Sequence, residues 1–421
     1  MKYLYIIFLC YTGESADRII PPKSPILQYQ TVQGQNMDSH RIIREAEGEV
    51  WVSCKIPGKP TIRGSLTSKG ISSDEVPEVT ASEEFVVQEV TKNRITVSCP
   101  EENISCTFLS PYASFSHIHE KNVSYLDISS GGDLGVSSST DQTFKVWETH
   151  NTEVKSVLEG HTRDVFSCKF FPSGQEVLSG GLDSLVKVWS VNDGSCLATM
   201  KGHRGSILDI AVVADGQNVI SSGQDGTARL WDSAQGACIA VVDDSYSPIN
   251  AIAVAEVGNA VNLGSPKETP SNREVGTEGK LVVLAREDKS LEGVSLHSRQ
   301  SVFDFEGSDA FNCCTFISSV GVLAGGLDGN IIHVDIRNPK SAVETVSWSE
   351  TPVLSLVPFR DTYVASYGNG TCYIPLKGSE QVLQLTGPNR QPVFQVAAWK
   401  KLVYTCCRDG FIRKYEIPDL G

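Results

Sequence analysis

The sequence predicts an all-β fold: a closed ring of seven four-stranded blades, with a small β-rich domain at the N-terminus. The first observation behind this prediction is a repeated segment that runs from Asp to Trp and ends at Trp147, Trp189 and Trp231. These residues follow a fixed period, because 189 − 147 = 42 and 231 − 189 = 42. A period of about 40–45 residues, with four short strands in each unit, is typical of a β-propeller blade.

The second observation is a turn residue that continues this period through the rest of the chain. The turn residues are Asp141, Asp183, Asp225, Asp288, Asp328, Asn369 and Asp409, at steps of 42, 42, 63, 40, 41 and 40 residues. Each lies between two apolar runs, and Asp-Gly between such runs is a hairpin signal because the turn requires residues that tolerate positive φ. Seven hairpins predict a seven-bladed WD40 β-propeller, whose blades bury their faces only by stacking in a ring.

The third observation concerns the two ends of the ring. The last apolar run covers residues 411–417, and only four residues follow it. The outer strand of the last blade must therefore come from ahead of the first repeat, and we expect it in residues 113–119. Pairing the two ends removes an exposed edge strand that would otherwise template aggregation.

Three domains follow from these boundaries: an extension over residues 1–40, a small N-terminal domain over 41–112 and the propeller over 113–421. Residues 50–54, 85–90 and 95–99 are apolar runs with strand character. We therefore expect the small domain to be rich in β-strands and to pack on the ring.

The first 40 residues allow two interpretations. Lys2 and the nine apolar residues after it resemble a secretory signal, although the run is too short to span a membrane as a helix. A start at Met37 would instead produce an ordinary cytosolic N-terminus. The twelve cysteines show no paired metal-binding spacing and favour free thiols in a reducing cell. We therefore expect residues 1–40 to be a disordered extension or a mispredicted first exon, and the protein to be cytoplasmic, with a nuclear location also compatible.

The composition narrows the classes of partner. The net charge is −14, which argues against general binding to nucleic acid or to anionic membranes and is compatible with a basic protein partner. The sequence contains no phosphate-binding loop, no His-Glu-x-x-His and no Gly-x-Ser-x-Gly. We expect neither a cofactor nor a metal site.

Blades two and three share a polar set that we interpret as structural. Its members are His161, Ser179, Asp183 and Trp189 in blade two, and His203, Ser221, Asp225 and Trp231 in blade three. The set resembles the His–Ser–Asp–Trp tetrad of WD40 blades, and such a network rigidifies a fold when every member is satisfied. Nucleophilic catalysis also uses Ser, His and Asp, but an active site would occur once and this set recurs with the blades. We therefore expect no enzyme. Blades five and seven have Val334 and Tyr415 in place of the Trp, so we expect them to be softer.

The loops that lead into the inner strand of each blade, called the leading loops below, are expected on one end of the ring. Those of blades four to six are acidic, whereas those of blades two and three carry Arg163 and Arg204 beside Asp164. The acidic residues predicted to contact a partner are Asp164, Asp243, Asp244, Glu306, Asp309 and Glu350. A second interpretation is that these residues form a solvated charged rim without a binding role.

Blade four contains about 21 extra residues within 255–279, since its step is 63 residues. Their Gly, Pro, Ser and Asn content is typical of a loop. Insertions in repeat rings can serve binding, and this one is expected at the end of the ring opposite the leading loops. A passive flexible loop is the other interpretation.

Several segments resemble the proteasomal ATPase-associated factor family. They include Gly-Glu-Val-Trp-Val-Ser-Cys at 48–54, Arg-Glu-Val-Gly-Thr-Glu at 273–278, Gly-Ser-Asp-Ala-Phe-Asn-Cys-Cys-Thr-Phe at 307–316 and Tyr-Thr-Cys-Cys-Arg-Asp-Gly at 404–410. The resemblance implies an assembly chaperone, without enzymatic activity, of the 19S regulatory particle. Such a protein binds the C-terminal domains of ATPase subunits of the base, restrains 26S proteasome assembly or activity, and is a monomer outside that complex.

A substrate receptor of a cullin-RING ubiquitin ligase is the alternative. Receptors of that kind carry Trp-Asp-x-Arg after a blade. Here Trp231-Asp-Ser-Ala lacks the Arg, and Val334-Asp-Ile-Arg lacks the Trp. Native affinity purification separates the two functions, because free base ATPases and a cullin adaptor are different partners.

Overall fold

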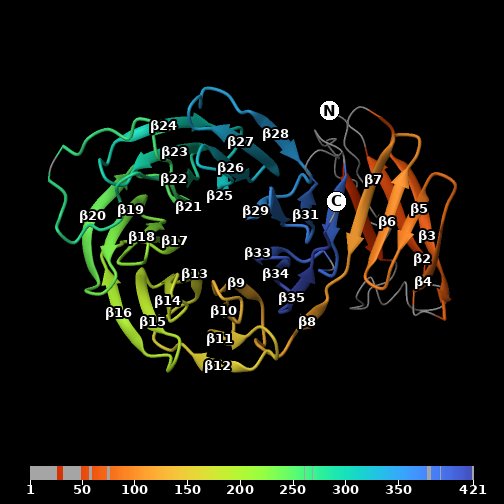
Figure 1. Ribbon diagram of the computed structural model, residues 1–421, viewed down its shortest axis with the longest axis horizontal. Helices are drawn as coiled ribbons and strands as arrows, with labels where there is room; N and C mark the ends of the chain where they lie inside the picture. Colours follow the sequence, from red (N-terminus) through yellow and green to blue (C-terminus); the bar gives the residue numbers. More distant parts are fainter. Residues whose placement is uncertain are drawn as a thin grey trace, which may run out of the picture.

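A ring of β-blades with a smaller β-unit at its side is visible in the computed structural model (Figure 1). The structure describes residues 26–31, 49–55, 59–73, 76–259, 261–267, 269–376, 381–388 and 390–419. Their regular elements are strands, and within these residues no helix is long and apolar enough to cross a membrane. The all-β prediction is therefore confirmed.

Seven blades of four antiparallel strands form the ring, each with its first strand innermost (Figure 1). Blade one contains β9 (Val123–Ile128), β10 (Leu134–Ser139), β11 (Phe144–Glu148) and β12 (Val154–Val157). Blade two contains β13 (Val165–Phe170), β14 (Glu176–Gly181), β15 (Leu185–Ser190) and β16 (Cys196–Lys201). Blade three contains β17 (Ile207–Val213), β18 (Asn218–Gly223), β19 (Thr227–Asp232) and β20 (Ala237–Asp244). Blade four contains β21 (Ile249–Glu256), β22 (Lys280–Arg286), β23 (Ser290–Ser295) and β24 (Ser301–Glu306).

The remaining three blades follow the same order. Blade five contains β25 (Phe311–Phe316), β26 (Gly321–Gly326), β27 (Asn330–Asp335) and β28 (Glu344–Ser347). Blade six contains β29 (Val353–Phe359), β30 (Thr362–Tyr367), β31 (Cys372–Pro375) and β32 (Val382–Leu385). Blade seven contains β33 (Val393–Trp399), β34 (Leu402–Cys407), β35 (Ile412–Glu416) and, as its outer strand, β8 (Ala113–Phe115). The prediction of seven blades is confirmed.

The turn residues hold the seven central hairpins through one repeated hydrogen bond. In every blade the side-chain oxygen accepts from the backbone N–H two residues later, at 2.8 Å for Asp141, 3.3 Å for Asp183, 3.1 Å for Asp225, 3.1 Å for Asp288, 3.0 Å for Asp328, 3.1 Å for Asn369 and 3.0 Å for Asp409. This Asx-type turn explains why the acid, or Asn in blade six, persists where the Trp does not.

The ring closes through β8, which lies within the segment 113–119 expected for this role. It pairs antiparallel with β35, with Phe115 opposite Ile412. The backbone N–H of Tyr112 donates to the carbonyl of Lys414 at 2.7 Å. Blade seven thereby obtains its fourth strand from the other end of the propeller sequence.

The N-terminal unit is joined to the ring by strand pairing, which is a more direct connection than the packing that the sequence predicted. Its first sheet contains β1 (Ile26–Thr31), β2 (Glu49–Lys55), β3 (Ile62–Ile71) and β4 (Pro77–Ala81). Its second contains β5 (Val86–Val90), β6 (Arg94–Cys99) and β7 (Ile104–Leu109), and β7 pairs parallel with β32, so that blade six and these strands form one seven-stranded sheet. Phe85, Val97 and Phe108 belong to the core of the unit. The unit is therefore connected to the ring by backbone hydrogen bonding as well as by the chain.

The structure extends this unit into the segment 1–40 that the sequence analysis set apart as an extension. The backbone of β1 pairs antiparallel with β2. A strand that pairs in this way belongs to the sheet, so the N-terminal unit includes residues ahead of 41. The rest of the predicted extension, apart from β1, lies outside the described residues.

The extra residues of blade four are tied to the ring at several points. The backbone N–H of Val275 donates to the side-chain oxygen of Asn218 in blade three at 2.7 Å. Arg299 donates to the buried carboxylate of Glu274 at 2.7 Å, and the Gln300 side chain donates to the carbonyl of Ser265 at 2.9 Å. These contacts argue against the interpretation of the segment as a passive flexible loop.

The cysteines of the described residues form no disulfide bonds with one another. Nine of them are buried, and two, Cys196 and Cys238, are exposed on outer strands. Burial raises the pKa of the Cys407 thiol to about 12, so this thiol stays protonated at neutral pH. Such cysteines act as small apolar side chains in the blades.

A channel of about 600 Å³ runs through the ring and is lined by the inner strands of all seven blades. Burial raises the pKa of Asp127 and of Asp209, and the ammonium of Lys169 opposes this rise. Asp209 also accepts from the backbone N–H of Ile252 in blade four at 2.9 Å. The lysine therefore balances two carboxylates that connect neighbouring blades.

Lys169→Met should lower the free energy of unfolding by about 2 kcal/mol at pH 7, because it leaves two largely buried carboxylates without their cation. Its loss raises the folded-state pKa of Asp127 and Asp209 further above the unfolded value. The folded variant then takes up protons more readily than the unfolded chain, so the deficit should shrink as the pH falls from 7 to 5. Urea titrations at both pH values measure this, with the exposed Lys155→Met as control; an equal deficit at both pH values would contradict it.

Candidate partner-binding face

The polar set of blade two forms one continuous hydrogen-bonded chain. The indole N–H of Trp189 donates to Ser179 Oγ at 2.7 Å, and Ser179 Oγ lies 2.7 Å from His161 Nε2. His161 Nδ1 lies 3.0 Å from both carboxylate oxygens of Asp183. Since Trp can only donate and a carboxylate can only accept, His161 donates from Nδ1 and accepts at Nε2.

The protonation states agree with this direction. Burial lowers the pKa of His161, and Asp183 only partly opposes the shift, so the imidazole is neutral at pH 7. Burial also works against the charge of Asp183, but hydrogen bonds from the Thr162 N–H and from His161 together lower its pKa. The pair is thus a neutral imidazole donating to a carboxylate.

Blade three repeats the geometry with little change. Trp231 donates to Ser221 Oγ at 2.8 Å, and His203 Nε2 lies 2.8 Å from the same oxygen. His203 Nδ1 lies 3.0 Å from Asp225. Both predicted sets are therefore complete networks between the leading loop, the second strand, the turn and the third strand of a blade.

Blade one contains a third network that the sequence analysis missed. Trp147 donates to Ser137 Oγ at 3.0 Å, and His119 Nε2 lies 2.7 Å from that oxygen. His119 Nδ1 lies 3.5 Å from Asp141, and burial lowers the pKa of His119 to about 4. Ile118 replaces the Gly that precedes His in the other blades. The spacing would have identified the residue, because 141 − 119, 183 − 161 and 225 − 203 all equal 22.

In blades five and six, serines replace the histidine. Ser308 Oγ donates to Asp328 at 2.5 Å in blade five, and the Asn369 side chain donates to Ser349 Oγ at 3.0 Å in blade six. Val334 is fully buried in the Trp position of blade five. The short serine side chain reaches the turn residue only. These blades therefore lack the hydrogen bond that the histidine of blades one to three makes to a serine of the second strand.

The acidic residues predicted for the leading loops are not equivalent, and the structure places Asp243 and Asp244 at the end of β20 and Glu306 at the end of β24. Asp244, Glu306 and Glu350 are exposed, as the hypothesis of a contact surface requires. The Asp243 carboxylate instead lies 2.8 Å from Arg286 Nη2, and that guanidinium also contacts Glu292 at 2.7 Å. The prediction of Asp243 as a free acidic contact therefore disagrees with the structure, because its charge is compensated by a buried arginine in the next blade.

The other two acidic candidates are half-buried. Asp309 accepts from the backbone N–H of Ala310 at 2.9 Å, which ties its carboxylate to the start of blade five. Asp164 lies beside the hairpin turn of blade two, where its carbonyl accepts from the N–H of Leu182 at 2.9 Å. Both remain on the same end of the ring as the exposed acids.

Apolar residues at the channel mouth are the part of this face that the sequence analysis missed. A hollow of about 430 Å³ lies inside the leading loops; its apolar lining residues are Phe166, Leu182, Leu208, Pro248 and Leu327. Phe166 and Leu327 are 37% and 42% exposed, although both are large and apolar. The sequence signal was an apolar residue directly before the turn acid, found only in blades two and five. A search for charge alone could not identify it.

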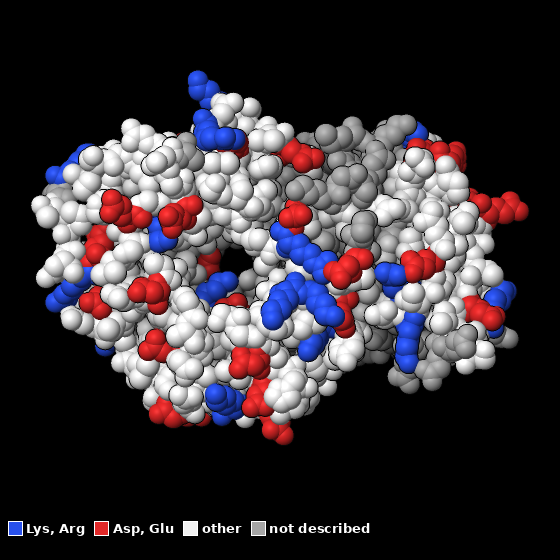
Figure 2. All heavy atoms as spheres, viewed as in Figure 1, with Lys and Arg blue, Asp and Glu red and all other residues white. Residues whose placement is uncertain are grey.

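Figure 2 shows one face of the ring, with acidic side chains spread around it and basic ones gathered beside the blade of β33–β35. Among the described residues no cluster of His, Cys, Asp and Glu could hold a metal ion. A hollow with a mixed polar and apolar lining, at an end of the ring that also carries exposed carboxylates, suits contact with a protein surface.

Comparison with known proteins places this architecture in a family. The WD domain, G-beta repeat family matches residues 110–148, 152–190 and 194–232. A chicken protein named proteasomal ATPase-associated factor 1 is 61% identical over 383 residues, covering 91% of this chain and 98% of its own. The chain belongs to the proteasomal ATPase-associated factor 1 family. The human member is 59% identical over the same shares, and a Dictyostelium discoideum protein named as a probable member is 35% identical over 87% of this chain and 91% of its own.

Membership of this family and the repeat fold indicate a proteasome-associated scaffold protein. The match to the relatives extends beyond the three repeats and includes most of the N-terminal unit and the extra residues of blade four, since it covers 91% of this chain. The family name therefore applies to the whole architecture described above.

Ser221→Ala should lower the free energy of unfolding by about 2–3 kcal/mol, because it leaves the buried Trp231 N–H and His203 Nε2 without a partner. The control is Ser222→Ala, on the same buried strand, whose hydroxyl makes only a 3.5 Å hydrogen bond to the Asp209 carbonyl. We expect that control to cost less than about 1 kcal/mol. Equal losses in urea unfolding would show that the network adds nothing beyond burial.

Amide hydrogen exchange should be slower in β18 and β19 of blade three than in β26 and β27 of blade five. The complete network holds the first pair to its leading loop, whereas Ser308 reaches only the turn in the second. Local opening should therefore require less free energy in blade five. Mass-spectrometric exchange at peptide level tests this, and uniform protection around the ring would contradict it.

Proposed function

We propose that this protein is a non-enzymatic assembly chaperone of the 19S regulatory particle. In this proposal it binds the C-terminal domain of an ATPase subunit of the base and restrains formation or activity of the 26S proteasome. The names of its relatives support the connection with proteasomal ATPases. The residues that would carry the contact come from the leading loops.

The observation that carries the proposal is that one end of the ring combines exposed carboxylates at the outer strands with exposed apolar side chains at the channel mouth. Asp244, Glu306 and Glu350 present exposed carboxylates there, and Phe166 and Leu327 offer exposed apolar area. A partner with an apolar contact residue among lysines and arginines complements such a surface. The net charge of −14 also attracts a positively charged partner over long range.

The mechanism requires only occupancy. Since β7 pairs with β32, the N-terminal unit is fixed to blade six rather than tethered by a linker. A rigid body of this size on one ATPase subunit would block neighbouring surfaces sterically. No bond in the partner is made or broken.

Asp244→Lys with Glu306→Lys should weaken binding to the recognised ATPase C-terminal domain by about tenfold at low salt, mainly by slowing association. Each of the base ATPase C-terminal domains is immobilised separately, and the kinetics are measured by surface plasmon resonance. The matched control is Glu153→Lys with Asp215→Lys, which makes the same charge change at two exposed loop positions at the other end of the blades.

Two results would contradict the proposal. One is that none of the ATPase domains binds the unmodified protein; the other is that both double variants lose affinity equally. Native purification that recovers a cullin adaptor without base ATPases would favour the ubiquitin-ligase receptor instead.

A further inference from the structure

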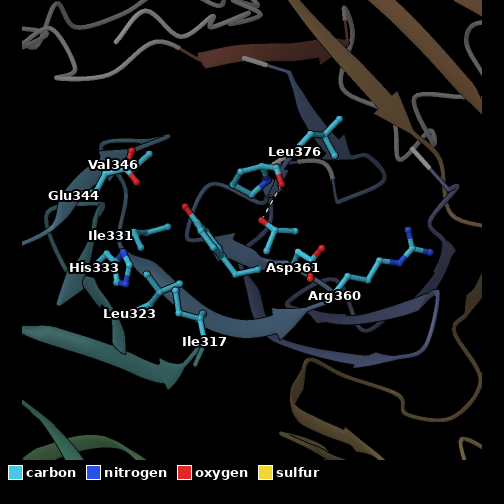
Figure 3. Close-up of a pocket in the computed structure, with 12 residues that line it drawn as sticks. Ile317, Leu323, Ile331, His333, Glu344, Val346, Arg360, Asp361 and Leu376 are labelled. Carbon is cyan, nitrogen blue, oxygen red and sulfur yellow. Dashed lines mark hydrogen bonds between the residues drawn. The ribbon is translucent and has the colours of Figure 1, made fainter. Parts of the chain in front are cut away.

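A second hollow lies between blades five and six, at the end of the ring opposite the leading loops. Its volume is about 420 Å³. Blade five contributes Ile317, Leu323, Ile331, His333, Glu344 and Val346; blade six contributes Arg360, Asp361, Thr362, Tyr363, Pro375 and Leu376. Figure 3 shows the two groups facing each other, with Glu344 and Val346 on one side and Leu376 on the other. This pocket takes no part in the function proposed above.

The pocket lies at the repeat position where blades one to three carry an indole and blade six carries Pro375. Trp189 and Trp231 lie six residues after their turn acids, and Pro375 lies six residues after Asn369. Trp189 packs against Phe144 of the preceding blade, with ring centroids 6.1 Å apart. Pro375 is much smaller than Trp and leaves the corresponding space towards blade five open.

The floor of the pocket is apolar. Leu323, Ile331 and Val346 lie in it and are 3%, 2% and 9% exposed. Ile317, in the loop between β25 and β26, is 38% exposed at its edge. Exposed apolar area beside an apolar hollow indicates a site that a side chain of a partner can cover.

The charged groups at the rim leave a negative balance. Arg360 donates to the carbonyl of Pro418 at 3.1 Å and forms an ion pair with Asp419 at 3.0 Å, and Figure 3 shows its side chain extending away from the blade-five residues. The carboxylates of Glu344 and Asp361 have no hydrogen-bond or ion-pair partner among the described residues. His333 adds a polar group beside them.

We infer that this pocket binds a peptide segment in which an aliphatic side chain of Leu or Met size is next to Lys or Arg. The aliphatic side chain occupies the apolar floor in the place of the missing indole. The cationic side chain pairs with Glu344 and Asp361 at the rim, whose carboxylates have no partner among the described residues and provide the complementary charge. The protein thus has a second recognition site, at the end of the ring opposite the leading loops.

A randomised twelve-residue peptide library displayed on phage tests this inference with the full-length protein. After selection, clones that also bind the Glu344→Lys, Asp361→Lys double variant are subtracted. The remaining peptides should share an aliphatic residue next to Lys or Arg. The double variant should bind a synthetic peptide of that consensus about tenfold more weakly than the unmodified protein does, since each charge reversal replaces attraction by repulsion.

Pro375→Trp supplies the second variant, because it restores the side chain that blades one to three carry at this position and should abolish peptide binding by filling the pocket. Glu153→Lys with Asp215→Lys is the matched control for charge and should bind the peptide unchanged. Thermal unfolding of each variant establishes that the ring is folded. Peptides without a basic residue, or peptides that bind Pro375→Trp as well as the unmodified protein, would overturn the inference. These measurements use no ATPase domain, so their outcome is independent of the proposed chaperone function.

Discussion

The pairing of β8 with β35 is the interaction on which the rest of the ring depends. Each blade buries its faces only against two neighbours, so an open ring would expose one face of blade one and one of blade seven. Between those blades lie Trp147, Tyr404 and Ile412, which share one apolar core. The loss of the β8 strand would expose part of this core and leave β35 as an unpaired edge. Closure therefore stabilises far more surface than the three residues of β8 provide.

The same stretch of chain also connects the N-terminal unit to the ring. β7 adds to the outer edge of blade six, and after residues 110–112 the chain continues as β8 on the outer edge of blade seven. Residues 104–115 thus connect two adjacent blades from the outside. Backbone hydrogen bonding on both blades leaves little freedom for the N-terminal unit to rotate, which a flexible linker would have allowed.

The sequence predicted the parts of this fold that repeat. The period located all seven hairpins. Each turn needs an Asp or Asn side-chain oxygen that accepts from the N–H two residues later, and this local requirement is visible in the sequence. The parallel pairing of β7 with β32 was missed, since its partners are about 275 residues apart and no local pattern specifies them. His119 differs from the other two histidines because Ile118, and not Gly, precedes it, although its spacing to Asp141 is the same as theirs.

In the candidate surface, too, the sequence predicts which residues are acidic but not which of them are compensated by a neighbouring blade. Asp243 and Asp244 are equivalent in the sequence, yet a buried arginine 43 residues later compensates only the first. A charge in a leading loop is available to a partner only if the neighbouring blade does not neutralise it. The compensating Arg286 lies 43 residues after Asp243, in the next blade. A comparison of successive blades can therefore reveal this pairing, whereas the sequence around Asp243 alone cannot.

The complete networks also explain where this protein can vary its surface. In blades one to three the leading loop must supply a histidine to a fixed network, so part of each loop is committed to the fold. In blades five and six Ser308 and Ser349 contact the turn instead, and the neighbouring positions carry the exposed Glu306 and Glu350. The missing indole of blade six likewise leaves the pocket at Pro375. In blades five and six the relaxed network therefore coincides with exposed carboxylates and with this pocket, whereas the exposed Phe166 lies in blade two, where the network is complete.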